Sequence, residues 1–236
     1  MGQAMSRWYE TTLFDGAMEL FESNTQRKLR QRLFQYMDCD EPTNTTSVLE
    51  IGAGAGLNLP HYPVWVKELH ASSLSPDLPP KAKKRARKRN IKVYYKQGKP
   101  IGLPYPENSF DYVVATLILC SLPDREGFVK EIYRVLKPGG KYLFMDHAWQ
   151  SAEAQTHLSR MLAPLHRRLA LGCSLKSVWA DSVFTSAGFK REDLHVEEEI
   201  PKGFSWLVGK IFLGYATKRP EASDFKMDDR HGQRAC

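Results

Sequence analysis

The stretch Glu50-Ile-Gly-Ala-Gly-Ala-Gly56 decides the fold. It continues the apolar residues Val48 and Leu49, so the strand expected over residues 47–51 runs directly into a glycine-rich turn. Glycines in such a turn let a ligand approach the backbone, because no Cβ stands in the way. The fingerprint G-x-G-x-x-G of dinucleotide-binding turns would need a glycine at position 57, where this chain has Leu57. The turn therefore indicates a ligand other than a dinucleotide, or a purely structural role.

The acid Glu50 adds chemistry to this turn, since it lies two residues before the first glycine. A carboxylate at the carboxyl end of a strand, beside free backbone amides, suits a ligand that carries both an ammonium and a carboxylate group. The methionine end of S-adenosylmethionine is such a ligand. Other parts of the chain decide between this ligand and a structural turn.

Strands and helices alternate along the chain. Strands are expected over residues 47–51, 67–72, 91–96, 111–116, 141–145, 192–200 and 207–217. Helices are expected over residues 1–37, 80–90, 125–136, 152–171 and 177–187. Alternation at this spacing predicts an α/β fold with a doubly wound, mostly parallel seven-stranded sheet. The last two strands have no long helix between them, so we expect an antiparallel hairpin at one edge.

The composition is that of a globular protein, since 42% of the 236 residues are hydrophobic and 26% are charged. We expect one domain over residues 1–218, with an N-terminal helical cap over 1–40 and a ligand-binding core over 45–150. The polar composition after residue 218 predicts a disordered tail over 219–236. No apolar run approaches the roughly 18 residues of a membrane helix, and no secretory signal is found.

Basic residues are concentrated in one interval, because no acid occurs between Asp77 and Glu107. The interval holds ten cations: Lys81, Lys83, Lys84, Arg85, Arg87, Lys88, Arg89, Lys92, Lys96 and Lys99. A solvated helix face is the simplest interpretation. Attraction to an anionic membrane or to a nucleic acid are the alternatives.

The four cysteines, at positions 39, 120, 173 and 236, are widely spaced. They form no C-x-x-C pair and have no histidine at metal-ligand spacing, so the sequence predicts neither a disulfide framework nor a metal site. This cysteine usage is typical of a reducing compartment.

Three motifs together resemble the class I S-adenosylmethionine-dependent methyltransferases over roughly residues 45–150. In order along the chain they are Val48-Leu-Glu-Ile-Gly-Ala-Gly-Ala-Gly56, Leu103-Pro-Tyr-Pro-Glu-Asn-Ser-Phe-Asp111 and Arg134-Val-Leu-Lys-Pro-Gly-Gly140. The resemblance implies a Rossmann-like methyltransferase fold, S-adenosyl-L-methionine as the cofactor, and a methyl transfer reaction.

A narrower resemblance reaches almost to the end of the chain. Four short stretches are similar to the methyltransferase-like thiol S-methyltransferases of the endoplasmic reticulum and lipid droplets: Thr116-Leu-Ile-Leu-Cys-Ser121, Phe144-Met-Asp-His147, Leu171-Gly-Cys-Ser-Leu175 and Gly214-Tyr-Ala-Thr-Lys218. This resemblance implies a small, fairly apolar acceptor, with a thiol as the leading candidate.

The wider resemblance also implies a set of cofactor-binding residues. They are Glu50, Gly52, Ala53, Gly54 and Gly56 of the glycine-rich turn, Asn58 just inside the following helix, and Ser73, Gly98, Lys99 and Leu117 at the ends of later strands. The family normally has an acid after the second strand that accepts both ribose hydroxyls, and Ser73 stands there instead, with Asp77 four residues on. The acid expected near the adenine is replaced by Gly98 and Lys99.

The reacting methyl group is expected above residues 117–121 and beside Asp146 and His147, where the fourth and fifth strands end. An acceptor thiol reacts as a thiolate, so the imidazole of His147, tuned by Asp146, is the candidate catalytic base. Cys120 and Cys173 are interpreted as residues that line the pocket. The aromatic residues Trp149, Trp179, Phe204 and Trp206 form either the core or a roof over the acceptor.

We therefore predict a methyltransferase acting on a small-molecule acceptor. One alternative is an RNA methyltransferase that uses the basic segment 81–92, although its cations are not interleaved with aromatic residues, which makes nucleic acid the weaker partner. Another is a degenerate, non-catalytic binding protein that has lost cofactor affinity. The expected location is the cytoplasm, with peripheral membrane attachment through acylation of Gly2 as the alternative, because residues 1–6 fit the pattern M-G-x-x-x-[ST]. Oligomeric state is left open.

Overall fold

The computed structural model describes residues 24–37, 46–149, 155–169, 173–174, 179–200 and 209–220. Some of the predictions from sequence therefore lie outside the described residues. They concern residues 1–23 with Gly2, residues 221–236 of the tail, and Phe204 and Trp206.

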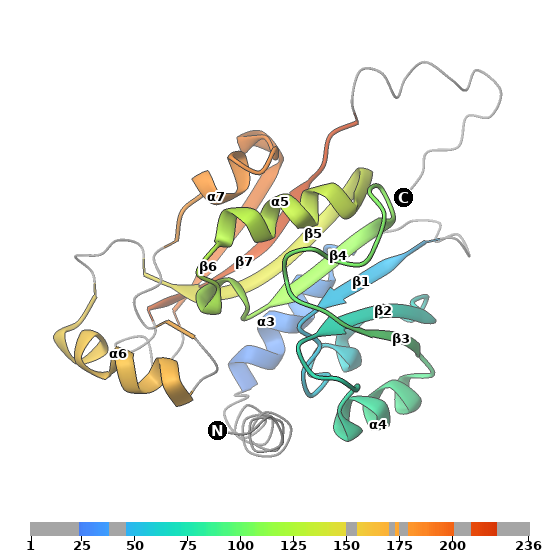
Figure 1. Ribbon diagram of the computed structural model, residues 1–236, viewed down its shortest axis with the longest axis horizontal. Coiled ribbons are helices and arrows are strands. Elements are labelled where there is room, and N and C mark those ends of the chain that lie inside the picture. The colour runs from blue at the N-terminus through green and yellow to red at the C-terminus, as the bar shows by residue number, and fades with distance from the viewer. Residues whose placement is uncertain are drawn as a thin grey trace.

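A single seven-stranded sheet forms the centre of the molecule, with helices on both of its faces (Figure 1). The strands are β1 (Val48–Ile51), β2 (Glu68–Ser73), β3 (Lys92–Gln97), β4 (Phe110–Thr116), β5 (Leu136–Ala148), β6 (Leu194–Glu199) and β7 (Lys210–Thr217). Their order is β3-β2-β1-β4-β5-β7-β6. Strands β1 to β5 pair in parallel, whereas β7 is antiparallel to both β5 and β6. The predicted fold class is confirmed, and the strand order reverses at β1, which creates a switch point between β1 and β4.

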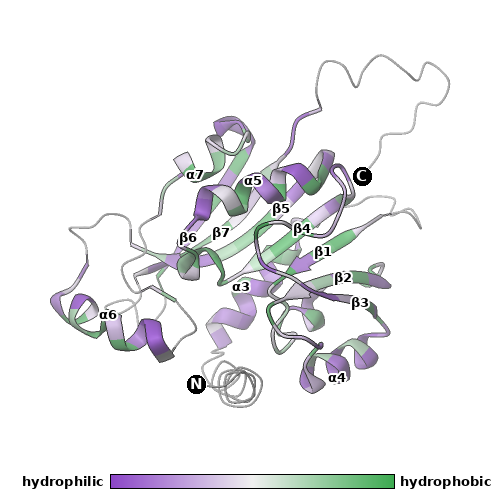
Figure 2. Ribbon diagram, viewed as in Figure 1, coloured by the Kyte–Doolittle hydropathy of each residue, from purple (hydrophilic) through white to green (hydrophobic). Residues whose placement is uncertain are grey.

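Five helices lie among the described residues, and four of them pack on the sheet. They are α3 (Asn24–Phe34), α4 (Pro80–Arg89), α5 (Arg125–Val135), α6 (His157–Leu169) and α7 (Ser182–Thr185), with short 3₁₀ turns η2 (Leu59–His61), η3 (Leu119–Ser121) and η4 (Arg191–Asp193). One apolar cluster joins the sheet to α3, η2 and α4, and the other joins it to α5 and α7. Adjacent strand residues such as Val113 and Val114 face opposite clusters. Burial on both faces explains the nearly continuous apolar strands (Figure 2).

A short 3₁₀ turn stands in the connection after β1, where the sequence analysis expected a helix. Within the described residues this connection contains only η2, which Asn58 precedes. Pro60 lies at the start of this turn and Pro63 follows shortly after it. Since proline removes a backbone donor and disfavours a helical residue before it, a regular helix cannot continue here.

Among the boundaries that differ from the predictions, two have a clear physical reason. The helix expected over residues 177–187 is reduced, in its described part, to the four residues of α7, because the backbone N–H of Trp179 donates to the carbonyl of Trp149 (2.8 Å) instead of entering a helix. Strand β5 begins at Leu136, before the breaker at residues 137–140. The breaker ends α5 as predicted, but it forms an irregularity inside the strand pairing between β4 and β5.

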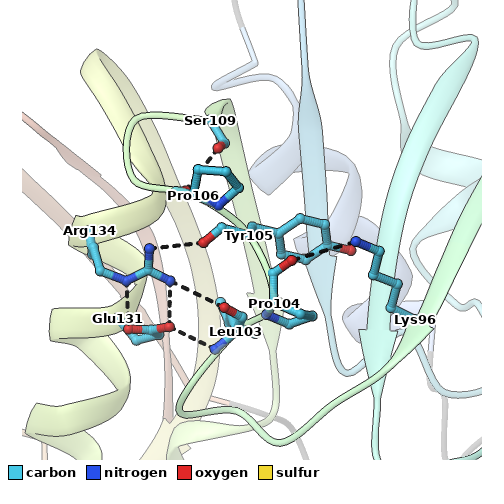
Figure 3. A network of polar contacts seen from close by, with 8 residues as sticks. All are labelled: Lys96, Leu103, Pro104, Tyr105, Pro106, Ser109, Glu131 and Arg134. Atoms are coloured by element: carbon cyan, nitrogen blue, oxygen red, sulfur yellow. Dashed lines mark hydrogen bonds and ion pairs between the residues drawn. The ribbon is translucent and has the colours of Figure 1, made fainter.

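The proline-rich loop before β4 is held by α5 (Figure 3). The guanidinium of Arg134 donates to the carbonyls of Tyr105 (2.9 Å) and Leu103 (3.3 Å), and the backbone N–H of Leu103 donates to Glu131 (2.7 Å). Glu131 also pairs with Arg134 at 2.7 Å. These contacts give a physical reason why the second and third sequence motifs occur together.

Helix α4 carries most of the basic segment, and its cations serve two purposes. Arg85 and Arg89 turn inward and donate to the carbonyls of Ala55 (2.7 Å) and Tyr62 (2.5 Å), which fixes the connection after β1. Five others are exposed: Lys81, Lys83, Lys84, Arg87 and Lys88. Attraction of this exposed face to an anionic membrane stays a prediction. No helix among the described residues is both long enough and apolar enough to cross a bilayer.

Candidate active site

The glycine-rich turn after β1 has a backbone that glycine adopts far more readily than other residues. The φ angle is +74° at Gly52, +44° at Gly54 and +76° at Gly56. Space is short as well, because a Cβ on Gly52 would lie 2.3 Å from Cδ1 of Ile118, and one on Gly56 would lie 2.9 Å from Cα of Ala82. The turn is therefore packed between the residues that follow β4 and helix α4.

The carboxylate of Glu50 lies beneath this turn and is buried. Its two oxygens accept hydrogen bonds from Nδ2 of Asn58 (2.9 Å) and from the hydroxyl of Tyr62 (2.9 Å). Burial raises the pKa of Glu50 to about 7, although these two hydrogen bonds and the charge of Arg30 act in the opposite direction. Glu50 is thus part of a buried polar network that sets the shape of the turn.

Arg30 of α3 belongs to the same network and was missed by the sequence analysis. Its guanidinium is buried and donates to the side-chain oxygen of Asn58 and to Oγ1 of Thr116, the latter at 3.0 Å. Because many cations surround Arg30 in the sequence, only its position between the apolar residues Leu29 and Leu33 could have indicated burial. Through Arg30, helix α3 contacts Asn58, which follows the glycine-rich turn, and Thr116 at the end of β4.

Other predicted cofactor residues meet at the carboxyl ends of the strands. The backbone N–H of Gly98 donates to the carbonyl of Ser73 (3.0 Å), and the Ser73 hydroxyl pairs with the hydroxyl of Tyr95 (2.7 Å). Leu117 has a φ of +58°, which is unusual for a residue other than glycine, and its N–H donates to the carbonyl of Met145 (2.7 Å). Strained backbone of this kind is often found where a ligand binds.

The remaining predicted cofactor residues are placed differently. Ala53 is buried in the turn, whereas the side chain of Lys99 is exposed. The hydroxyl of Ser72 is buried and has no hydrogen-bond partner among the described residues. This orphaned donor lies next to Ser73, and a Cβ on Gly98 would lie 3.0 Å from it. An unsatisfied polar atom at this edge, together with the strained turn, fits a bound polar ligand.

Where β4 and β5 end, four polar side chains come together. The imidazole Nε2 of His147 lies 2.8 Å from Sγ of Cys173. Cys120, His147 and Cys173 each place a ligand atom within 4.8 Å of the other two. Buried Asp146 accepts hydrogen bonds from the backbone N–H groups of Cys120 (3.3 Å) and His147 (2.9 Å). Asp146 and His147 thus lie together as expected, but the two cysteines belong to this polar cluster and are not simply apolar lining.

The pKa values of the groups in the cluster are shifted in different directions. A hydrogen bond from Cys173 lowers the pKa of Cys120 well below its usual range, and the same bond raises the pKa of Cys173. Burial raises the pKa of Asp146 well above its usual range. Of the two thiols, Cys120 is therefore the one that ionises first.

Apolar side chains border the cluster. A cavity of about 10 Å³, the size of one water molecule, is lined by both kinds of residue: Leu119, Arg125, Asp146, His147, Ala148, Trp179, Ala180, Val183 and Phe184. Trp179 stacks on Phe212 with 4.7 Å between ring centroids, so it belongs to the core and also lines the cavity. Trp149 is buried. A larger cavity of about 420 Å³ lies elsewhere, against α4 and β3, and includes Asp77 and Tyr95 in its lining.

Known proteins resemble this chain over most of its length. The family described as methyltransferase domain matches residues 49–144. The rat protein thiol S-methyltransferase TMT1B is 31% identical over 203 residues, which cover 82% of this chain and 79% of that protein. Human thiol S-methyltransferase TMT1A is 29% identical over 211 residues, which cover 84% of this chain and 82% of that protein. The chain belongs to the class I S-adenosylmethionine-dependent methyltransferases.

Solved structures agree on the fold of this methyltransferase. YcgJ from Bacillus subtilis superimposes with a TM-score of 0.64 at 19% identity, covering 82% of this chain and 99% of that one. Phosphoethanolamine N-methyltransferase 2 from Haemonchus contortus, solved with S-adenosyl-L-methionine, gives a TM-score of 0.59 at 16% identity, covering 84% of this chain and 58% of that one. Because the chain belongs to the S-adenosylmethionine-dependent methyltransferases, S-adenosyl-L-methionine is its cofactor, as predicted.

Proposed function

We propose that this methyltransferase acts on the sulfur of a small, fairly apolar thiol. The observation that carries the proposal is the polar cluster of Asp146, His147 and the two cysteines, because Asp146 and His147 also line a cavity whose other lining residues, apart from Arg125, are apolar. A short apolar thiol has the matching chemistry, with a hydrocarbon body and one ionisable sulfur, and the cavity, which has room for one water molecule, would widen to admit it. The names of the rat and human relatives, both thiol S-methyltransferases, support the same acceptor class.

The glycine-rich turn and the strand ends beside it are the proposed cofactor site. The turn would bring its backbone N–H groups close to the cofactor, since glycine leaves no side chain in between. The Ser72 hydroxyl, which has no partner in the described part of the chain, and the Ser73–Tyr95 hydroxyl pair would offer hydrogen bonds at the end of β2. Glu50 would act from beneath, because its carboxylate fixes Asn58 and Tyr62.

When bound, the cofactor supplies a methyl group on a positively charged sulfur that an acceptor can displace in line. Two tasks then fall to the protein, namely to position the acceptor and to remove its proton. Leu119, Trp179 and Val183 would exclude water and hold the apolar body of the acceptor. The polar cluster would receive the acceptor sulfur and favour its ionised form, because a thiol of ordinary pKa is only slightly ionised near neutral pH.

The proposal is tested by a panel of acceptors with purified full-length protein and labelled S-adenosylmethionine. Butane-1-thiol, a phenol, a primary amine and total RNA are compared at equal acceptor concentration, and the products are identified by mass spectrometry. We expect methyl butyl sulfide as the dominant product. The variant Gly54→Val serves as the control without cofactor binding, because a branched side chain at a φ of +44° would obstruct the turn.

A different dominant product would overturn the thiol assignment. Methylated RNA would favour the basic face of α4 as the substrate-binding surface, and this activity would fall steeply with salt. Absence of cofactor binding at millimolar concentration would instead support a non-catalytic binding protein. Arg85 and Arg89 do not favour the RNA alternative, because both side chains already donate hydrogen bonds to backbone carbonyls of the protein.

A further inference from the structure

Three potential metal ligands from distant parts of the sequence meet at the proposed acceptor site. Cys120 lies in η3, His147 near the end of β5, and Cys173 in a separate segment. Their ligand atoms all lie within 4.8 Å of one another. The backbone N–H of Ser174 donates to the carbonyl of Cys120 (2.9 Å), which holds the two cysteine-bearing segments together.

The type of ligand and its spacing favour zinc. Two thiolates and one imidazole are ligands that Zn²⁺ commonly takes, at about 2.3 Å from sulfur and about 2.0–2.1 Å from nitrogen. Tetrahedral geometry at these bond lengths separates the ligand atoms by roughly 3.5–3.8 Å. Nε2 of His147 and Sγ of Cys173, 2.8 Å apart, lie closer than this, and all three ligand atoms lie within 4.8 Å of one another, so small side-chain movements would bring them to these distances.

The backbone of two of the three potential ligands is held by one residue. The buried carboxylate of Asp146 accepts hydrogen bonds from the backbone N–H groups of both Cys120 and His147. These bonds fix where the two side chains start, so the cluster is assembled before any metal binds. Among the described residues, no fourth His, Cys, Asp or Glu joins the group. Three protein ligands with one open position are characteristic of catalytic zinc sites, whereas structural sites are closed.

We propose that Cys120, His147 and Cys173 bind one zinc ion, and that its open position takes the sulfur of the acceptor thiol as a thiolate. This inference rests on the proposed thiol acceptor. The thiol loses its proton to the water or hydroxide that it replaces on zinc. A bond then forms between the acceptor sulfur and the methyl carbon, while the bond from that carbon to the cofactor sulfur breaks and its electron pair stays on that sulfur, giving S-adenosylhomocysteine. The product is a neutral thioether, a weaker zinc ligand than a thiolate, and it dissociates.

The zinc site replaces the role of general base that the sequence predicts for His147. A base must exchange a proton at Nε2, whereas a ligand needs only a lone pair there. His147→Cys separates the two roles, because cysteine can bind zinc but lacks the imidazole. A zinc site predicts that His147→Cys keeps about one zinc per chain and most of the thiol methylation that His147→Ala loses. Equal loss of methylation in both variants, with zinc kept in His147→Cys, would restore the base assignment.

Metal binding is measured first on the wild-type chain, without reference to activity. Protein purified under reducing conditions is analysed for bound metals, and its affinity is measured by competition with a chromophoric zinc chelator. Reconstitution with Co²⁺ should produce intense thiolate-to-cobalt charge-transfer absorption. Butane-1-thiol should intensify this absorption by adding a further sulfur ligand, whereas butan-1-ol should not. Absence of metal binding, or a Cys120–Cys173 disulfide in the reduced preparation, would overturn the proposal.

Matched substitutions then locate the site. Cys120→Ser and Cys173→Ser should each weaken zinc binding more than a hundredfold, beyond what loss of an outer hydrogen-bond partner usually costs. His195→Ala, at an exposed histidine, should leave zinc binding unchanged. The same Cys→Ser change at Cys39 and Cys236 should also leave it unchanged. If Cys39→Ser or Cys236→Ser lost zinc, that cysteine would be a fourth protein ligand. The metal would then have no open position for the acceptor thiol, and the proposal would fail.

Failure of this inference can be told apart from failure of the proposed function. Thiol methylation by a metal-free protein, unaffected by a strong chelator, would remove the zinc and leave the thiol acceptor intact. Stoichiometric zinc binding without thiol methylation would remove the acceptor assignment and leave the metal site intact. The Co²⁺ spectrum reports on metal ligation in either case.

Discussion

Arg30 in α3 and Thr116 at the end of β4 are 86 residues apart in the sequence, yet Nη1 of Arg30 lies 3.0 Å from Oγ1 of Thr116. Arg30 is 3% exposed and also donates to Asn58, which in turn donates to Glu50. The guanidinium thus joins the first described helix to the residues beneath the glycine-rich turn.

Replacement of Arg30 should be costly for stability. In Arg30→Met, the buried oxygens of Asn58 and Thr116 lose a donor and Glu50 loses a nearby positive charge, so we expect the free energy of unfolding to fall by about 3 kcal/mol. The matched control is Arg32→Met, because Arg32 is 40% exposed and pairs with surface acids. It should cost no more than about 1 kcal/mol. If urea unfolding showed the same loss of free energy of unfolding in Arg30→Met and Arg32→Met, the buried network would contribute no more to stability than an exposed ion pair.

Crowding at Gly56 can be separated from its backbone conformation. Gly56→Ala pays for a positive φ and for a Cβ placed 2.9 Å from the backbone of Ala82. Gly102 has the same φ of +76° with nothing within 4 Å of an added Cβ, so Gly102→Ala is the matched control. We expect a loss of about 1 kcal/mol at Gly102 and a further 1–3 kcal/mol at Gly56, measured by urea unfolding. Cofactor affinity, measured by calorimetry, should fall at Gly56 only.

The missing ribose acid can be restored at Ser73. If the ribose hydroxyls bind beside Ser73, Ser73→Asp should tighten S-adenosylmethionine binding roughly tenfold, because a charge-assisted hydrogen bond replaces a neutral one. The hydroxyl of Tyr95 donates to the carbonyl of Ser75 (2.5 Å), so it accepts from the Ser73 hydroxyl (2.7 Å) and would have to leave that carbonyl to donate to the new carboxylate. Calorimetry measures the affinity, with Asp77→Asn as a test of the alternative acid. If the affinity is unchanged in Ser73→Asp and weaker in Asp77→Asn, then Asp77, and not residue 73, binds the ribose hydroxyls.

Stability should depend on pH through Glu50. Its pKa is about 7 in the folded protein and near 4.5 when unfolded, so between these values the folded state holds a proton that the unfolded state has lost. The resulting stabilisation is fully present below pH 4.5 and is lost as the pH rises through 7, with a total of about 3 kcal/mol. Glu50→Gln cannot titrate and removes this dependence.

Urea unfolding of wild type and Glu50→Gln between pH 5 and pH 8 measures the effect. The free energy of unfolding of the wild type, relative to that of the variant, should fall by about 3 kcal/mol over this range. Other titrating groups, such as His61, are present in both proteins and largely cancel. Glu68→Gln, at an exposed acid, should follow the wild-type profile. A constant difference between wild type and Glu50→Gln would show that the carboxylate stays ionised at pH 5.

The sequence alone determined the sheet and the family. Apolar runs at 48–51 and 110–116, the glycines of the first turn and the breaker after α5 are local signals, because they depend on backbone sterics and on periodic burial within a few residues. They were enough to predict a doubly wound sheet with an antiparallel edge, whereas the methyltransferase and its S-adenosylmethionine were implied by the resemblance of three motifs to a known family. Local signals failed at the connection after β1, where Pro60 and Pro63 exclude the helix that the βαβ pattern suggests.

Only the tertiary structure decided which polar groups meet. Cys120, His147 and Cys173 carry no metal-binding spacing in the sequence, and their approach depends on the ends of β4 and β5 lying side by side and close to residues 173–174. Arg30 likewise is indicated in the sequence only by its place between Leu29 and Leu33, and nothing there names its partners. Contacts between distant residues cost loop-closure entropy that is repaid only by the packing of the whole sheet, so no short stretch of sequence contains them. The chemistry of the acceptor site is therefore a property of the folded chain.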